Sequence, residues 1–116
     1  MTDFDPTDDV AVRAVLLARK ADLTRLIASS KDSRAAVELD QSRVGRLSRM
    51  DAIQGQAMAI ETDRRRALDL TRLAAALARL DAGVYGVCVR CGEEIAAKRL
   101  NFDPALALCV DCATEG

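Results

Sequence analysis

The stretch from Tyr85 to Cys112 reads YGVCVRCGEEIAAKRLNFDPALALCVDC and contains all four cysteines of the chain. Cys88 and Cys91 form one CxxC pair, and Cys109 and Cys112 form a second pair after residues 92–108. In a CxxC turn both sulfurs can point to one side, so two such turns can close a tetrahedral four-thiolate site. This spacing is typical of a zinc ribbon or a treble-clef knuckle. The motif therefore predicts one structural Zn²⁺ bound by these four cysteines.

Two other chemistries use paired CxxC motifs, namely redox-active thiols and a rubredoxin-like iron site. An iron-binding electron carrier needs a packed core. The aromatic residues of the chain are Phe4, Tyr85 and Phe102, which are too few for such a core. A closed four-thiolate zinc site has no open position for water, so it is structural and not catalytic. The chain has no histidine, which excludes Cys2His2 sites and histidine-based catalysis. We therefore favour zinc, and we do not expect an enzyme.

The composition favours long helices. Half of the 116 residues are hydrophobic, mostly Ala, Leu, Val and Ile, and they are mixed with many Arg, Asp and Glu residues. The formal net charge of −1 provides no long-range attraction to nucleic acid, so direct DNA binding is not expected. Neither a signal peptide nor a membrane span is recognisable. We expect a soluble, cytoplasmic and mainly α-helical protein, and in a reducing cytoplasm the cysteines favour metal over disulfides.

Two amphipathic helices are predicted ahead of the cysteines. The first covers about residues 6–29, with Asp5 as N-cap and Pro6 in its first position. Its apolar stripe consists of Val12, Val15, Leu16, Ala18, Leu23, Leu26 and Ile27. The second covers about residues 50–82 and ends before Gly83, with Ser48 and Asp51 resembling a capping box at its start.

The second helix carries two apolar stripes that both fit a coiled-coil seam. They consist of Met50, Ile53, Ala57 and Ile60, and of Leu70, Leu73, Leu77 and Leu80. The stripes are not in one heptad phase, which predicts a stutter near Arg64, Arg65 and Arg66. A helix of this length must pack on the first one, so we expect an antiparallel coiled-coil hairpin over residues 1–82 and a zinc-finger module over 83–116.

The tip of this hairpin, at about residues 32–48, is rich in charge. Asp40, Arg43, Arg46 and Asp51 are the candidate partner-contact residues in and beside it. Charged runs often only solvate a loop, and the three arginines at 64–66 fit that interpretation. In a helix, however, Arg43, Arg46 and Arg49 would share a face that could meet an acidic protein surface or phosphates.

The order YGVCVRCGEEIAAKRL, followed by Pro104 and Ala105 and then LALCVDC, resembles the signature of the DksA/TraR family of bacterial transcription regulators. The resemblance is close over residues 83–112, whereas the hairpin matches in pattern only. It implies a regulator that binds RNA polymerase rather than DNA. Such a regulator inserts its coiled-coil tip into the secondary channel near the catalytic magnesium, and it sometimes acts together with ppGpp.

The sequence departs from this family at two places. The family's tip carries two aspartates three residues apart and then an alanine, and the best match here is Asp40, Arg43 and Gly45, with a base in place of the second acid. Longer members continue with a C-terminal helix that contacts polymerase and ppGpp, whereas this chain ends at Gly116, so dependence on ppGpp is not predicted. A zinc-stapled helical adaptor that binds another protein, without activity on polymerase, is the alternative function.

Overall fold

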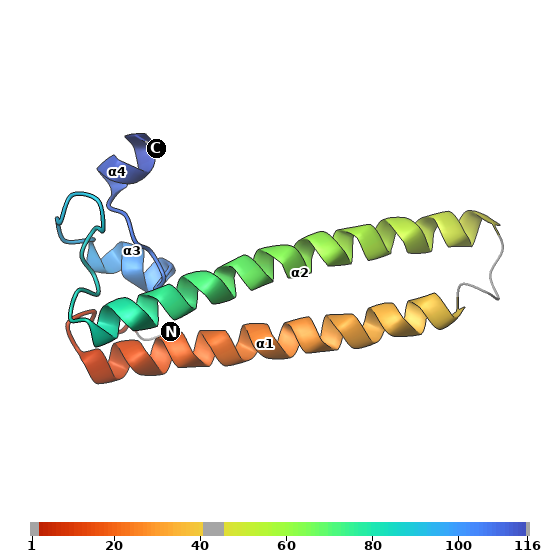
Figure 1. Cartoon of the computed structure of the whole chain (residues 1–116), viewed down its shortest axis with the longest axis horizontal. Coiled ribbons are helices and arrows are strands. Elements are labelled where there is room, and N and C mark those ends of the chain that lie inside the picture. Colours follow the sequence, from red (N-terminus) through yellow and green to blue (C-terminus); the bar gives the residue numbers. More distant parts are fainter. Residues whose placement is uncertain (1–2, 41–45, 116) are drawn as a thin grey trace. The chain divides into compact units, whose positions relative to one another are not determined.

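The computed structural model describes residues 3–40 and 46–115, and the side chains of residues 33–49, 51 and 52 fall outside that description. Four helices follow one another in the chain: α1 (Asp9–Asp40), α2 (Arg46–Asp81), α3 (Ala97–Phe102) and α4 (Val110–Glu115) (Figure 1). In this described part, extended pairing is limited to an isolated antiparallel bridge between Val87 and Glu94. The predicted mainly α fold, two long helices followed by a small cysteine module, is confirmed.

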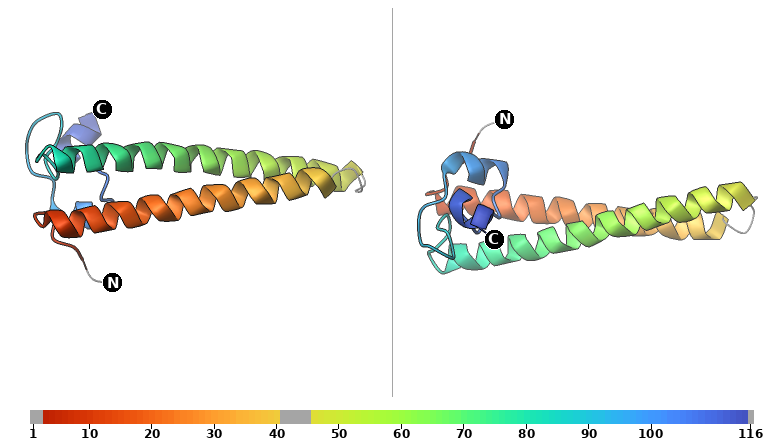
Figure 2. Two further views of the ribbon diagram at one scale, coloured as in Figure 1. Left: turned by 60° about the horizontal axis from the view of Figure 1, so that its bottom comes forward. Right: turned by 90° about the horizontal axis from the view of Figure 1, so that it is seen from above.

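The chain separates into two compact units, Met1–Lys20 with Thr71–Gly116 and Ala21–Leu70. In the first unit, the start of α1 lies beside the end of α2 and runs in the opposite direction, with α3 and α4 in the same unit (Figures 1 and 2). In the second unit, the remaining parts of α1 and α2 also lie side by side and antiparallel. The predicted division between residues 82 and 83 stays a prediction.

None of the helices in the described ranges is both long and apolar enough to cross a membrane.

The start of α1 is fixed by Asp8 and not by the predicted cap Asp5. The Asp8 carboxylate accepts hydrogen bonds from the backbone N–H groups of Val10 and Ala11, at 3.1 and 3.2 Å. Its carbonyl accepts the first bond of the helix from Val12 N–H, at 2.9 Å. Asp5 instead closes the preceding turn, because its carboxylate accepts from the N–H and hydroxyl of Thr7, which lowers the pKa of Asp5. The helix therefore begins one turn later than predicted.

The other helix limits also differ from those predicted. α1 does not end near residue 29 but continues to Asp40, and α2 already begins at Arg46. The segment 29–33 contains three serines and an aspartate, which disfavour a helix only weakly. No proline or glycine interrupts the sequence between Pro6 and Gly45, so the backbone can remain helical. Ser48 consequently lies inside α2, and the predicted capping box is wrong.

In the first unit the predicted seam of the hairpin is confirmed except at Ala18, which is exposed. Val12 and Leu16 of α1 are completely buried, and so is Ala76 of α2. Leu73 and Leu80 are almost as well covered, and Leu77 is half-buried. Arg13 of α1 and Asp81 of α2 form an ion pair at the exposed edge of this unit. Packing of these aliphatic side chains is the main source of stability for two helices that would be marginal alone.

In the second unit the predicted stripe of α2 is wrong, and the predicted stripe residue Leu26 of α1 is 44% exposed. Met50, Ile53 and Ile60 are 59%, 53% and 51% exposed, and Ala57 is also exposed. The less exposed positions of α2 there are Gln56, Ala59, Asp63, Arg66, Asp69 and Leu70. From residue 56 onward, steps of three and four through 59, 63, 66 and 70 lead directly to 73, 77 and 80, so no stutter is needed.

A hydrophobicity pattern does not identify this continuous seam, because polar side chains occupy some of its positions. Arg66 and Asp63 form an ion pair of 3.2 Å on α2, and both side chains are largely covered. Arg64 and Arg65 are exposed, as predicted, and both pair with Glu61. The hydrogen bond from Arg64 lowers the pKa of Glu61 to about 2. The arginine run thus has two solvated members and one seam member.

Candidate metal centre

The first CxxC pair lies in a tight turn that follows α2. The Cys88 N–H donates to the Glu93 carbonyl at 2.8 Å, and the Gly92 N–H donates back to the Cys88 carbonyl at 2.9 Å. Gly92 has a φ of +79°, a left-handed conformation that glycine adopts without a steric penalty. The bridge between Val87 and Glu94 closes the base of this turn. Cys88 and Cys91 therefore lie in one hydrogen-bonded loop.

The second pair lies at the start of α4. Cys109 immediately precedes that helix, Cys112 lies within it, and the Ala113 N–H donates to the Cys109 carbonyl at 3.0 Å. The segment before Cys109 is held by two hydrogen bonds. Arg99 of α3 donates to the Leu108 carbonyl at 3.0 Å, and the Val89 N–H donates to the Ala107 carbonyl at 2.9 Å. The last bond joins the two cysteine loops directly.

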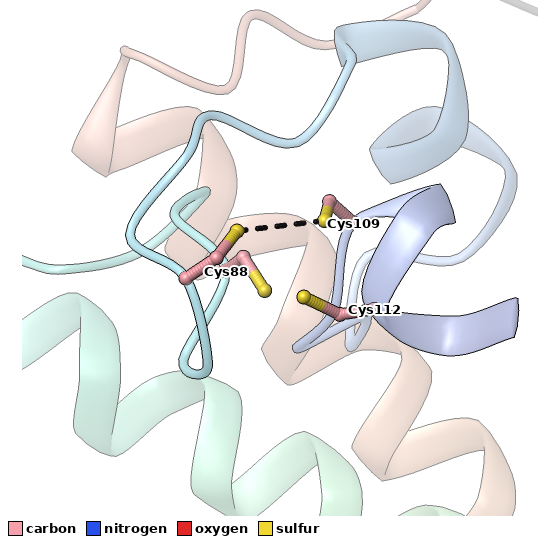
Figure 3. A group of neighbouring side chains, drawn as sticks. Cys88, Cys109 and Cys112 are labelled. Carbon is pink, nitrogen blue, oxygen red and sulfur yellow. Dashed lines mark hydrogen bonds between the residues drawn. The ribbon is translucent and has the colours of Figure 1, made fainter. Parts of the chain in front are cut away.

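The structure brings the four cysteine sulfurs together, within 4.8 Å of one another. The sulfurs of Cys91 and Cys109 are 3.6 Å apart. A tetrahedral site with zinc-to-sulfur bonds of about 2.3 Å requires sulfurs about 3.8 Å apart, so the arrangement fits a four-thiolate zinc site. Figure 3 shows the sulfurs of Cys88, Cys109 and Cys112 directed into one common space.

The protein environment affects the thiols unequally. The backbone N–H of Cys109, with weaker help from those of Cys91 and Arg90, lowers the pKa of Cys88 to about 6. The neighbouring sulfur of Cys109, together with burial, raises the pKa of Cys112. Backbone N–H groups stabilise the anionic thiolate, whereas crowded sulfurs oppose a second negative charge. A divalent cation among the sulfurs would offset that repulsion, since metal binding requires deprotonated thiols.

A small hydrophobic cluster supports the sulfurs. Cys88, Ile95, Leu100 and Cys112 form its buried part. The partly buried residues packed against this cluster are Phe4, Tyr85, Leu106, Leu108 and Cys109. Because cysteines themselves make up half of the buried part, the cluster is too small to hold the module without a cross-link or a metal.

Polar contacts tie this module to the end of α2. Arg72 and Asp103 form an ion pair of 2.6 Å. Arg79 donates to the carbonyls of Ala105 and Leu106 at 3.4 and 3.3 Å, and burial lowers the pKa of its guanidinium. The Tyr85 hydroxyl donates to the carbonyl of the buried Pro104 at 2.8 Å. Arg72 and Arg79 therefore bind the segment 103–106 to α2, in addition to the packing around the cysteines.

Tyr85 offers a direct test of this packing. Burial of its ring raises the pKa of the phenol to about 12. The chain has one tyrosine and no tryptophan, so an ultraviolet titration of the zinc-loaded protein reports Tyr85 alone. We expect the ionisation midpoint near pH 12, against about 10 for a free tyrosine. Because the folded state favours the neutral phenol, this contribution to stability persists below pH 10 and is lost between pH 10 and 12. A midpoint near 10 in the folded protein would contradict the buried hydroxyl.

Sequence reasoning did not find every residue that supports the centre. It missed Asn101, whose side chain binds the backbone of Phe4, and it missed the roles of Arg72 and Arg79. The Asn101 contact joins residues that are 97 positions apart, so no local spacing signals it. The arginines lie on a helix rich in charged residues, and only the position of residues 103–106 distinguishes them from solvated neighbours.

The predicted contact residues of the hairpin tip cannot be placed as a site. Asp40 is the last residue of α1 and Arg46 is the first of α2, while Asp51 lies within α2. Their side chains, and all of Arg43, lie outside the described residues.

Comparison with known proteins agrees with the geometry of the cysteines. Residues 83–115 match the sequence model of the prokaryotic dksA/traR C4-type zinc finger. The RNA polymerase-binding transcription factor DksA of Haemophilus influenzae is 44% identical over 52 residues, which cover 45% of this chain and 35% of that protein. An uncharacterized protein of Aquifex aeolicus is 48% identical over 40 residues, covering 34% of this chain and 28% of that protein. The matches thus span about a third of these relatives.

The fold as a whole has a solved counterpart. The structure of the transcription factor DksA2 from Pseudomonas aeruginosa matches 96% of this chain and 84% of that chain, with a TM-score of 0.81 and 22% sequence identity. At this level of identity the match establishes the shared fold.

Proposed function

We propose that the chain is a transcription regulator of the DksA/TraR kind that binds RNA polymerase, because its residues 83–115 match the model of the dksA/traR C4-type zinc finger. The observation that carries this proposal is the 44% identity over 52 residues to a protein named for binding RNA polymerase. The similarity of fold to a second transcription factor of this kind supports it. On this proposal the protein acts in the cytoplasm by binding, not as an enzyme.

The metal in this proposal is a single Zn²⁺ held by Cys88, Cys91, Cys109 and Cys112. When bound, the ion supplies a covalent-like cross-link between the two cysteine loops, and its four thiolates leave no position for a reacting water. The chain's own residues orient the finger, because Arg79 near the end of α2 donates to the backbone carbonyls of Ala105 and Leu106. The finger therefore stabilises the first unit and does not itself perform chemistry.

The contact with polymerase is proposed for the turn between α1 and α2. In this proposal the turn enters the secondary channel, and Asp40, Arg43, Arg46 and Asp51 are its contact residues. Two long helices suit this role, because each satisfies most of its backbone hydrogen bonds internally.

A helical adaptor for another protein is the second candidate, and one observation favours it. Five large apolar side chains of α2 are at least half exposed in the second unit: Met50, Ile53, Met58, Ile60 and Leu68. Exposed apolar residues that gather on one element often mark a protein-binding surface.

A binding experiment with matched variants separates the two functions. The zinc-loaded protein is mixed with RNA polymerase from its own organism, and both binding and promoter-specific transcription are measured. We expect binding, a change in transcription, and loss of that change in a variant with Asp40→Ala and Arg43→Ala. A second variant combines Ile53→Ser with Ile60→Ser. If this variant loses binding to its partner protein while the variant with Asp40→Ala and Arg43→Ala still binds that partner, the adaptor is supported instead. Absence of binding to polymerase by the unmodified protein would refute the regulator.

A further inference from the structure

The N-terminal segment is attached to the cysteine module by a single side chain. The carboxamide oxygen of Asn101 accepts the Phe4 N–H at 2.7 Å, and its Nδ2 donates to the Phe4 carbonyl at 3.0 Å. The same Nδ2 donates to the Ala97 carbonyl of α3, also at 3.0 Å, which fixes the orientation of the amide. Asn101 thus satisfies both backbone groups of Phe4, as a neighbouring strand would in a sheet.

The ring of Phe4 is partly buried and packs against the hydrophobic cluster of the cysteine module. The buried members of that cluster are Cys88, Ile95, Leu100 and Cys112, two of which are predicted metal ligands. Phe102, the other phenylalanine, lies next to Asn101 in sequence but is 83% exposed. The ring of Phe4, whose backbone binds Asn101, is therefore more buried than the ring of Phe102, which follows Asn101 in the sequence.

The segment continues without a flexible linker into α1. The Asp8 N–H donates to the Asp5 carbonyl at 3.0 Å, which closes a turn around Pro6, and Asp8 then caps the helix. Phe4 could therefore leave its place only if its two hydrogen bonds to Asn101 broke or if the turn before α1 opened.

We propose that residues 3–8 form a strap that controls how firmly the finger retains its metal, with Phe4 and Asn101 as positioning residues. The inference rests on the proposed binding of zinc by the four cysteines. Because Cys88 and Cys112 must lie correctly for the ion and also belong to the cluster on which Phe4 packs, docking of the strap and binding of the metal favour the same arrangement. Linkage then requires each event to strengthen the other by the same factor.

The test measures the rate at which zinc leaves the full chain in the presence of excess chromogenic chelator. Phe4→Ala and Asn101→Ala should each release zinc about tenfold faster than the unmodified protein, at the lower end of the effects known for residues that support metal ligands. Phe4→Leu should restore most of the slow release, since it refills the cluster. Phe102→Ala is the matched control, and it should leave the rate unchanged because that ring is exposed.

Two further readouts separate a strap from a general loss of structure. With both Phe4→Ala and Asn101→Ala, release should be no more than slightly faster than in the faster single variant, because both residues hold one segment. The Phe4 amide should exchange slowly with deuterium in the zinc-loaded protein and rapidly after chelation. Multiplied effects, an unchanged exchange rate or equal effects of Phe4→Ala and Phe102→Ala would each overturn the strap. A protein that binds no zinc at all would instead refute the metal site.

Discussion

Replacement of Cys88 or Cys109 by serine is expected to abolish zinc binding and to unfold residues 83–115, while most of the helical signal of α1 and α2 remains. Structural zinc contributes about 10–16 kcal/mol in small zinc-finger peptides, far more than the few buried side chains of this module can replace. Only Ile95 and Leu100 would remain as buried non-cysteine members of its cluster. Serine keeps the approximate size of cysteine but has a poorly acidic hydroxyl that does not bind zinc as a thiolate does.

The experiment combines metal analysis with circular dichroism. Elemental analysis should give one zinc per unmodified chain and essentially none per variant, and the ellipticity at 222 nm should fall only modestly, because 68 of the 116 residues belong to α1 and α2. Arg90→Ala is the matched control, since Arg90 lies between two cysteines but has an exposed side chain. Chelation of the unmodified protein should reproduce the spectrum of the serine variants. A variant that keeps its full zinc content would contradict the four-cysteine site.

The cysteine site could be predicted from the sequence because its determinants are local. Each CxxC pair fixes two sulfurs within one turn, and Gly92 supplies the left-handed residue that such a turn requires. Only the meeting of the two pairs is non-local, and four thiolates in a reducing cell have few other uses. The structure accordingly brings together the same four sulfurs that the spacing selected.

The limits and the seam of the helices were predicted less well, for physical reasons. Ser29, Ser30 and Asp32 suggested a turn, but their weak helix propensity cannot end a helix that has no glycine or proline within it. Asp63 and Arg66 pair with each other and occupy seam positions that a hydrophobicity pattern assigns to solvent. That pattern therefore selected Ile53 and Ile60, which are about half exposed.

The supporting contacts of the finger depend on tertiary structure alone. Asn101 binds a residue from the opposite end of the sequence. Arg79 binds the main-chain carbonyls of Ala105 and Leu106, and because every residue has such a carbonyl, the residue types at these positions do not indicate the contact. A family resemblance confined to the finger cannot reveal such contacts either, because Phe4 lies outside the matched residues 83–115.

Substitution of Leu16 by alanine should reduce the free energy of unfolding by about 2–5 kcal/mol, whereas the same change at Leu17 should cost no more than about 0.5 kcal/mol. Leu16 is completely buried in the seam of the first unit, and its neighbour Leu17 is 48% exposed. The two variants remove identical atoms from adjacent positions of α1, so helix propensity changes equally in both. The difference between them therefore isolates burial in the seam.

Urea denaturation of the zinc-loaded proteins, followed at 222 nm, measures both changes, and Ile60→Ala tests the revised position of the seam on α2. Because Ile60 is 51% exposed, its truncation should resemble that of Leu17 and not that of Leu16. A loss of 2–5 kcal/mol is a large part of the roughly 5–15 kcal/mol that stabilises an ordinary domain. Leu16→Met, which conserves volume and should cost less than about 1.5 kcal/mol, keeps the comparison measurable if Leu16→Ala does not fold. Equal losses at Leu16 and Leu17 would contradict the seam, and a large loss at Ile60 would restore the apolar stripe as a packed surface.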